Sequence, residues 1–311
     1  MQPTVENTHE KAIAPKKGWR VWWNLLRPHT LTASFVPVFL GTAIAVQYGP
    51  IDFALFFAMF LASVLIQSAT NMFNEYYDFK RGLDNHESVG IGGAIVREGV
   101  SASTVLSLAL AFFAGAIALG VYICMETTWW LAVIGLVSMS VGYFYTGGPY
   151  PIAYTPFGEL ASGIFMGYGI ILISFYVQTG TVTGESILIS TPIAILVGAI
   201  LMANNIRDHD GDKENGRKTL AILLGQQQAV RFLAGMFIVS YAWIAILAAA
   251  GVLTPWALLI FISTAKAREA VKGFKNKKKP AEMMPGMKAT AQTNTFFGFL
   301  LTLGILFSYM A

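Results

Sequence analysis

The sequence predicts an all-α integral membrane protein that crosses the bilayer several times. Of its 311 residues, 55% are hydrophobic and only 12% are charged, whereas ordinary soluble domains carry roughly 25% charged residues. The apolar residues gather in continuous runs of about 20, the length that a helix needs to span the hydrocarbon core. They do not alternate with polar residues as in a membrane β-barrel. An aromatic content of 13% excludes a disordered chain, and a single cysteine excludes a disulfide framework.

Nine apolar runs are long enough to be transmembrane helices. Residues 1–20 precede them, are polar and carry no signal-peptide pattern, so we expect a disordered cytoplasmic tail. Residues 21–311 are expected to form one transmembrane domain. The predicted spans are 30–48, 53–74, 102–122, 128–146, 158–177, 187–206, 228–250, 253–271 and 290–310.

The distribution of charge predicts the orientation of these helices. With nine spans, all 21 Lys and Arg residues fall on one side of the membrane. The opposite side carries only Asp52, Glu126 and Glu185. Because cytoplasmic loops collect Lys and Arg, we expect the N-terminus inside and the C-terminus outside. The net charge of +4 then reflects topology, and no nucleic-acid partner is expected.

A polar stripe runs down the second predicted span. Gln67, Asn71, Asn74 and Asp78 are four, three and four residues apart, which places them on one face of a helix. Asp84 follows a glycine turn and can fold back toward Asp78. Amides and carboxylates inside a hydrocarbon span are costly and usually mark a site or a pathway.

A second acidic segment ends the sixth predicted span. Asn204, Asp208 and Asp212 are four residues apart and again share one helical face. Ligands that offer only oxygen suit Mg²⁺ or Ca²⁺ rather than Zn²⁺, and Mg²⁺ completes its shell with substrate phosphate. The residues alone therefore predict a metal-bridged diphosphate site at the cytoplasmic mouth of an apolar cavity. Cations follow both segments: Lys80, Arg81 and Arg97 after the first, and Lys213, Arg217 and Lys218 after the second.

Two other interpretations fit such stripes. Polar residues on a membrane helix can serve only to hold helices together. Ion-coupled transporters also use intramembrane acids, but they move a solute and release no diphosphate. A single stripe leaves these interpretations open. Two acidic stripes on the same side of the membrane, each followed by cations, favour a diphosphate site.

The two segments resemble the paired aspartate-rich motifs of the UbiA superfamily of intramembrane prenyltransferases. Asn74 and Asp78 match its Asn-x-x-x-Asp motif, and Asp208 and Asp212 match its Asp-x-x-x-Asp motif. In many members the first motif contains a second aspartate, four residues after the aspartate that corresponds to Asp78. Here glycine stands at that place, and Asp84 comes two residues later. This spacing is similar to that of the branch that prenylates 1,4-dihydroxy-2-naphthoate in menaquinone synthesis.

Other stretches resemble the same naphthoate branch. Residues 26–29 read Leu-Arg-Pro-His at the start of the first span, and residues 204–208 read Asn-Asn-Ile-Arg-Asp. After the fourth span, other branches place a Lys-Arg pair, whereas residues 146–149 read Thr-Gly-Gly-Pro without a cation. The resemblance extends from about Trp19 to the C-terminus. Branches that prenylate another aromatic acid, such as 4-hydroxybenzoate or homogentisate, are the alternatives within the superfamily.

The resemblance implies nine transmembrane helices around a central cavity that opens sideways to lipid. It implies Mg²⁺-dependent transfer of a polyprenyl group from polyprenyl diphosphate to 1,4-dihydroxy-2-naphthoate at the plasma membrane. Diphosphate and CO₂ would leave, and demethylmenaquinol would form. The oligomeric state is not predicted.

The same resemblance assigns roles to the polar residues. The implied Mg²⁺ ligands are Asn74, Asp78, Asp84, Asp208 and Asp212. The expected diphosphate contacts are Lys80, Arg97, Arg207 and Lys218. The residues expected around the acceptor and the carbocation are Gln67, Asn71, Tyr143, Tyr145 and Asn205.

Overall fold

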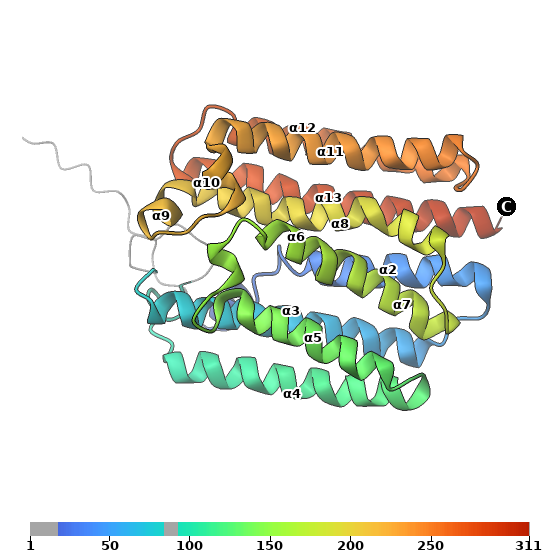
Figure 1. Ribbon diagram of the computed structural model, residues 1–311, viewed down its shortest axis with the longest axis horizontal. Coiled ribbons are helices and arrows are strands. Elements are labelled where there is room, and N and C mark those ends of the chain that lie inside the picture. Colours follow the sequence, from blue (N-terminus) through green and yellow to red (C-terminus); the bar gives the residue numbers. More distant parts are fainter. Residues whose placement is uncertain (1–17, 84–92, 311) are drawn as a thin grey trace, which may run out of the picture.

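The computed structural model describes residues 18–83 and 93–310, and no strand occurs within these ranges. Long helices lie side by side in one bundle, with α4 at one edge and α11 and α12 at the other (Figure 1). The all-α prediction is confirmed. The helices are α1 (Trp19–Leu25), α2 (Thr32–Ala45), α3 (Phe53–Lys80), α4 (Ala102–Glu126), α5 (Trp130–Thr146), α6 (Gly158–Ser162), α7 (Ile170–Thr179), α8 (Gly184–Arg207), α9 (His209–Glu214), α10 (Leu220–Leu224), α11 (Gln226–Ala249), α12 (Thr264–Phe274) and α13 (Pro280–Met310). A π-helical stretch, Gly163–Gly169, joins α6 to α7, and short 3₁₀ stretches are Val46–Tyr48, Ile152–Tyr154 and Pro255–Ser263.

Each predicted span overlaps a helical segment, but the segments differ in length. Two apolar helices, Thr32–Tyr48 and Trp130–Thr146, are shorter than a typical crossing. The eighth predicted span begins as 3₁₀ helix at Pro255 and continues as α12. The chain is a multi-pass membrane protein, while the count of nine crossings stays a prediction. Within the described ranges, six helices are long and apolar enough to cross a membrane: Phe53–Lys80, Ala102–Glu126, Gly158–Thr179, Gly184–Arg207, Gln226–Ala249 and Pro280–Met310.

The starts of the two helices that carry the polar stripes follow from local sequence. Asp52 accepts the N–H of Leu55 at 3.0 Å and so caps α3. Thr183 and Ser186 form a capping box at the start of α8. Both caps lie at the end of the bundle opposite to the acidic residues, so each helix runs the full length of the bundle before it reaches its acidic segment.

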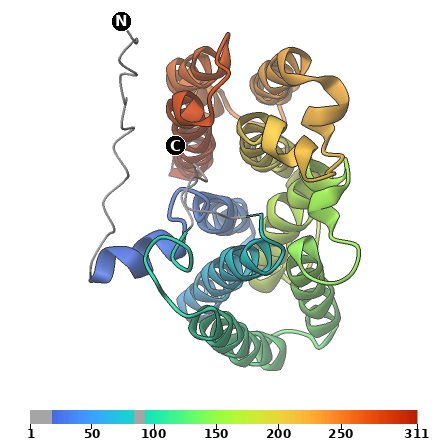
Figure 2. The same ribbon diagram turned by 90° about the vertical axis from the view of Figure 1, so that its left-hand side faces the viewer.

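The densest part of the core lies between α2, α8, α11 and α13. Its buried side chains include Ile193, Phe237 and Phe297. Helices α12 and α13 approach closely where Gly273 meets Gly286, since a Cβ at Gly273 would collide with the backbone of α13. Viewed along the helices, α12 and α13 lie on one side and α4 on the other, with α2 and α3 between them (Figure 2). This packed half supports the helices that carry the second acidic segment.

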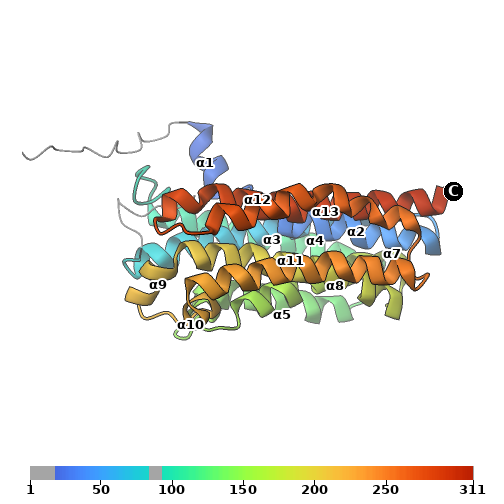
Figure 3. The ribbon, with the colours of Figure 1, turned by 90° about the horizontal axis from the view of Figure 1, so that it is seen from above.

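The C-terminal ends of α3 and α8 lie at the same end of the bundle, beside α9 and α10 (Figures 1 and 3). Helix α13 ends at the opposite end (Figure 1). Two segments far apart in the sequence therefore share one end of the molecule.

One expectation about the second segment needs correction. Asp208 does not lie within a continuous helix, because α8 ends at Arg207 and α9 begins at His209. The backbone of Asp208 has a ψ of 5°, which bends the chain between the two helices. The Asp212 N–H nevertheless donates to the Asp208 carbonyl at 2.8 Å, so the two acids keep the spacing of one helical turn.

Candidate functional site

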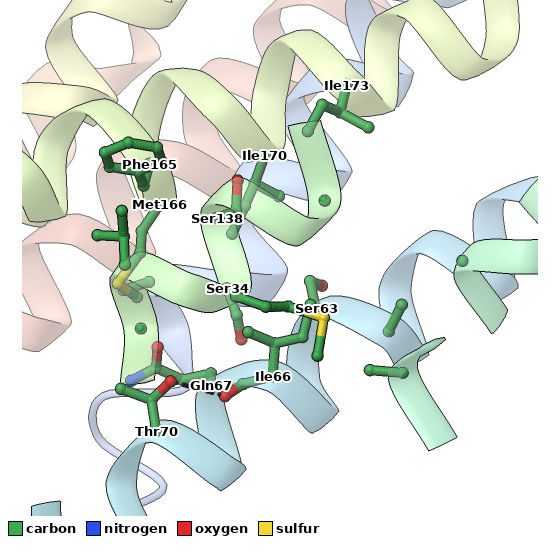
Figure 4. A pocket seen from close by; sticks show the side chains of 18 of the residues that line it. Ser34, Ser63, Ile66, Gln67, Thr70, Ser138, Phe165, Met166, Ile170 and Ile173 are labelled. Atoms are coloured by element: carbon green, nitrogen blue, oxygen red, sulfur yellow. Dashed lines mark hydrogen bonds between the residues drawn. The ribbon is translucent and has the colours of Figure 1, made fainter. Parts of the chain in front are cut away.

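A cavity of about 390 Å³ lies inside the bundle. Its walls come from α2, α3, α4, α5, the segment 158–179 and α8. Figure 4 shows Gln67 and Thr70 on one side of it and Phe165 and Met166 on another. Most of the lining is apolar, so the cavity can hold a long hydrocarbon group whose polar head lies at one end. The polar side chains of that end are Arg27, Thr30, Gln67, Asn71, Asn74 and Asn204.

The upper part of the predicted stripe on α3 is buried against the turn between α1 and α2. The Asn71 amide donates to the Leu26 carbonyl at 2.8 Å and to Thr30 Oγ1 at 2.9 Å. The Gln67 amide donates to Asn71 Oδ1 at 3.3 Å and to Thr30 Oγ1 at 3.5 Å. Both residues line the cavity. Their donors are used within the protein, so these amides hold the turn in place.

The lower part of the stripe meets the second acidic segment. Asn74 Oδ1 accepts a hydrogen bond from Thr146 Oγ1 at 2.8 Å. Asp78 lies 3.0 Å from Nη2 of Arg217, and Nη1 of the same guanidinium lies 3.0 Å from Asp212. Between 10% and 19% of these three charged side chains is exposed. A guanidinium therefore joins the two motifs, which would otherwise repel each other.

Aromatic and backbone groups hold this bridge in place. The Arg217 guanidinium lies 5.1 Å from the centre of the Tyr154 ring, and Arg81 lies 5.7 Å from the same ring. Arg81 also donates to the carbonyls of Thr146 and Gly148. The turn that follows α5 is thereby fixed beside the acidic segments, and its carbonyls face a cation that comes from α3.

The remaining aspartate of the second motif has a cation of its own. Arg207 donates to both carboxylate oxygens of Asp208, at 2.7 and 2.5 Å, and lies 2.9 Å from the sulfur of Met287. Two residues before Arg207 in α8, Asn205 donates to Glu159 Oε1 at 2.9 Å. Asn205 was predicted to hold the acceptor, but its amide faces α6 and a buried carboxylate.

Burial perturbs the titration of the groups at this end. Burial raises the pKa of the Asp212 carboxyl to about 6, although the adjacent Arg217 guanidinium lowers it. Burial would lower the pKa of Arg217, but the neighbouring carboxylates outweigh it and raise that pKa. Burial, with the charge of Arg27, lowers the pKa of His29 to about 4. Burial therefore disfavours the charged form of Asp212, and a further cation nearby would stabilise that form.

Three residues predicted to contact diphosphate lie at the edge of this arrangement. Lys80 is exposed, with its Nζ 5.5 Å from the centre of the Tyr76 ring. Lys218 is also exposed. The half-buried Arg97 packs its side chain directly against Gly93, where there is no room for a Cβ. Their contacts with diphosphate stay predictions.

The two tyrosines predicted to face a carbocation differ in position. Tyr145 lines the cavity. The hydroxyl of Tyr143 lies 2.6 Å from that of Tyr77, and its ring packs edge-on against Phe73. Tyr143 is not among the described residues that line the cavity. Of the two tyrosines, Tyr145 is therefore the one that borders the cavity, and the contact of either ring with a carbocation stays a prediction.

Three charged residues at this end of the bundle were not predicted from the sequence to belong to the site. Arg217 was one of several cations after the second motif, and no spacing rule distinguished it from its neighbours. Arg27 was quoted only within a stretch of resemblance. Glu75 lies off the face of the polar stripe, yet its side chain is buried and accepts the Gly93 N–H at 2.7 Å. The signal that could have revealed Glu75 and Arg27 is their position beside long apolar runs, where an isolated charge needs a partner.

The two acidic segments fit a divalent cation by the chemistry of their donors. Asp78, Asp208 and Asp212 offer only oxygen, as Mg²⁺ prefers. Within the described residues, no three His, Cys, Asp or Glu side chains lie close enough together to hold a metal ion. The carboxylates contact Arg217 and Arg207 instead. Metal binding would therefore require these guanidinium groups to move or to share their carboxylates.

A model of the UbiA prenyltransferase family matches residues 34–291. The chain belongs to this family. The predicted resemblance is confirmed, and with it the class of membrane-bound prenyltransferases. The chain is 59% identical to the 1,4-dihydroxy-2-naphthoate octaprenyltransferase of Bacillus subtilis (strain 168), over 97% of this chain and 98% of the relative. It is 26% identical to the Escherichia coli (strain K12) protein of the same name, over 94% and 97% of the two chains.

Solved structures of the UbiA family share the fold. A UbiA homolog from Aeropyrum pernix K1, solved without ligand, has a TM-score of 0.67 at 17% identity and covers 91% of this chain and 98% of its own. A homolog from Archaeoglobus fulgidus, bound to DMAPP and Mg²⁺, has a TM-score of 0.61 at 16% identity and covers 91% and 99%. At these identities the likeness shows the UbiA fold alone.

Proposed function

We propose that this member of the UbiA family transfers a polyprenyl group from polyprenyl diphosphate to 1,4-dihydroxy-2-naphthoate. The observation that carries the proposal is the meeting of two acidic segments, from α3 and from α8–α9, at the polar end of an apolar cavity. The Bacillus subtilis relative, 59% identical, is named for transfer of an octaprenyl group to the same acceptor. Demethylmenaquinol is the proposed product.

Mg²⁺ is the proposed cofactor, in line with the Archaeoglobus fulgidus homolog solved with DMAPP and Mg²⁺. When bound, the ion supplies positive charge that stabilises the departing diphosphate. Arg217 and Arg207 lie against the motif acids, which supports a role for their guanidinium groups as donors to phosphate oxygens. Lys80, Arg97 and Lys218 remain further candidates for such contacts. The proposed ligands are Asn74, Asp78, Asp208, Asp212 and Asp84, of which Asp84 lies outside the described residues.

The apolar cavity determines the fate of the allylic cation. The C–O bond of the donor breaks with its electron pair on diphosphate, and the ring carbon of the acceptor attacks the allylic carbon. The carboxyl group at that ring carbon then leaves as CO₂, and its bonding electrons restore the aromatic ring. Apolar walls keep water from the cation, and Tyr145 can turn its π face toward it.

The orientation in the membrane is proposed from the same arrangement. Nine crossings would place both acidic segments, α9 and α10 at the cytoplasmic face of the plasma membrane. The basic residues between α12 and α13 belong to that side in this scheme, which agrees with the positive-inside rule. The end of α13 at the opposite face supports an odd number of crossings.

A direct assay tests the proposed function. Purified protein in detergent is incubated with radiolabelled polyprenyl diphosphate, Mg²⁺ and, separately, 1,4-dihydroxy-2-naphthoate, 4-hydroxybenzoate and homogentisate. We expect a prenylated product with the naphthoate, and none when EDTA replaces Mg²⁺. Absence of a prenylated product with every acceptor, together with solute flux in sealed vesicles, would support the transporter interpretation instead.

A further inference from the structure

Arg27, in the turn between α1 and α2, adopts a strained backbone conformation. Its φ is 51°, in the left-handed region that residues other than glycine rarely occupy. Such a conformation costs about 1 kcal/mol or more and persists only where neighbours hold it. Here Thr30 Oγ1 donates to the Arg27 carbonyl at 2.9 Å, and Asn71 donates to the Leu26 carbonyl at 2.8 Å. Strain that neighbouring side chains enforce in this way indicates a functional position.

The side chain of Arg27 lines the cavity with donors to spare. Only 22% of it is exposed, and its buried Nε has no hydrogen-bond partner. Within the described residues, its guanidinium makes one ion pair, to Glu75 Oε2 at 3.5 Å. Glu75 is 1% exposed and also accepts the N–H groups of Gly93 and Ile95. The countercharge is therefore fixed by other bonds, and most of the five N–H donors of Arg27 are left for a ligand.

The position of Arg27 decides which anion it can serve. Arg27 and Asn74 line the cavity, whereas Asp78, Asp208 and Asp212 lie beyond its lining. A diphosphate carries several negative charges, so we expect it to bind at the metal proposed beside those three acids. A single guanidinium that shares its charge with Glu75 suits one carboxylate, which it can bind through two parallel hydrogen bonds.

The other wall of the cavity offers no competing cation for a carboxylate. The turn after α5, residues 146–149, contains no charged side chain, and its carbonyls at Thr146 and Gly148 accept hydrogen bonds from Arg81. We propose that Arg27 binds the carboxylate of the aromatic acid acceptor and orients its ring in the cavity. Thr30 and Asn71 act as positioning residues that hold Arg27 in place. This inference rests on the proposed function, because it assumes that an aromatic acid enters the cavity.

The test compares ligands that differ only in a carboxylate. Binding of 1-hydroxy-2-naphthoate and of 1-naphthol is measured by titration calorimetry, without prenyl diphosphate, for wild type, Arg27→Gln, Arg27→Lys and Arg231→Gln. Arg231 is an exposed cation on α11, so its substitution removes the same charge away from the cavity. We expect Arg27→Gln to weaken binding of the acid by about 10- to 100-fold and to leave 1-naphthol binding unchanged. The affinity of Arg27→Lys for the acid should lie between those of wild type and Arg27→Gln. The affinity of Arg231→Gln should match that of wild type.

A second ratio is taken during turnover. For each variant, kcat/KM is measured with 1,4-dihydroxy-2-naphthoate and with 1,4-dihydroxynaphthalene, which lacks the carboxylate. The preference for the acid should shrink in Arg27→Gln and partly shrink in Thr30→Val, which keeps the shape of the side chain but loses its hydroxyl. Folding of Arg27→Gln is judged by size-exclusion chromatography in detergent. If this variant does not fold, binding and turnover are measured with Arg27→Lys and Thr30→Val instead.

The outcomes separate this inference from the proposed function. Equal losses for the acid and for 1-naphthol, or no loss for either, would overturn the role of Arg27. If Arg27→Gln raised the KM for polyprenyl diphosphate and left the preference for the acid unchanged, Arg27 would bind the prenyl donor. That result would also overturn its proposed role toward the acceptor. Wild-type protein that binds the acid through Arg27 but forms no prenylated product would instead refute the proposed function alone.

Discussion

Two arginine–carboxylate clusters involve carboxylates three residues apart on α3, Glu75 and Asp78. They differ in how many partners the guanidinium of the arginine has. Arg217 lies 3.0 Å from both Asp78 and Asp212 and stacks against Tyr154. Arg27 has one carboxylate at 3.5 Å, from Glu75, and a buried Nε without a partner.

The difference indicates two kinds of cation at one site. Arg217 neutralises carboxylates that would otherwise face each other, so it stabilises the protein before metal and substrate arrive. Arg27 is held in a strained turn while its donors stay available, so its interactions are completed only by a ligand. We therefore expect loss of Arg217 to appear first in stability, and loss of Arg27 first in ligand selectivity.

The largest expected effect comes from the acids that Arg217 and Arg207 contact. Asp78→Asn or Asp208→Asn should lower turnover by about a thousandfold, roughly 4 kcal/mol in the activation barrier, because a proposed ligand of the metal is lost. Turnover is measured with saturating polyprenyl diphosphate and naphthoate. Asp52→Asn is the matched control, since Asp52 caps α3 at the opposite end and asparagine can replace it as a cap. A variant that keeps more than about a tenth of wild-type turnover would remove its residue from the metal site.

The next effect concerns Arg217 itself. Arg217→Gln leaves two largely buried carboxylates without their common cation, which should cost about 3 kcal/mol of stability in the absence of metal. Thermal unfolding in detergent measures this loss as a lowered Tm. Addition of Mg²⁺ with inorganic pyrophosphate should raise the Tm of the variant more than that of wild type. Arg231→Gln serves as control, and an Arg217→Gln variant as stable as wild type would show that the bridge does not hold the acids.

The third expected effect appears only at acid pH and is the pH dependence of stability contributed by His29, two residues after Arg27. The pKa of His29 falls from 6.5 to about 4 on folding, because burial and then the charge of Arg27 disfavour its protonation. The unfolded chain therefore takes up a proton at a higher pH than the folded chain. Stability should fall as the pH drops from about 6.5 to about 4, by up to about 3 kcal/mol. Unfolding of wild type and His29→Asn across this range measures the effect; equal acid sensitivity of the two would contradict it.

The sequence predicted the class of fold and the two acidic segments, because both depend on spacing along one helix. Long apolar runs and the four-residue period of Asp208 and Asp212 are visible without any tertiary contact. The bend at Asp208 was not predicted, since nothing in the local pattern separates it from a continuous helix. The roles of Arg27 and Glu75 were also missed, because the pair forms only when the turn before α2 packs against α3. Periodicity assigns a residue to a face but does not reveal which distant charge it meets.

The most direct test of the account follows the carboxyl group of the acceptor. Wild-type protein is given polyprenyl diphosphate, Mg²⁺ and 1,4-dihydroxy-2-naphthoate labelled with ¹⁴C in the carboxyl group, and released CO₂ is counted against prenylated product. We expect one CO₂ for each product, and a kcat/KM for 4-hydroxybenzoate at least ~100-fold lower than for the naphthoate, a gap of about 2.7 kcal/mol in transition-state binding. Comparable efficiency with the two acids, or a prenylated product that retains the label, would contradict the account.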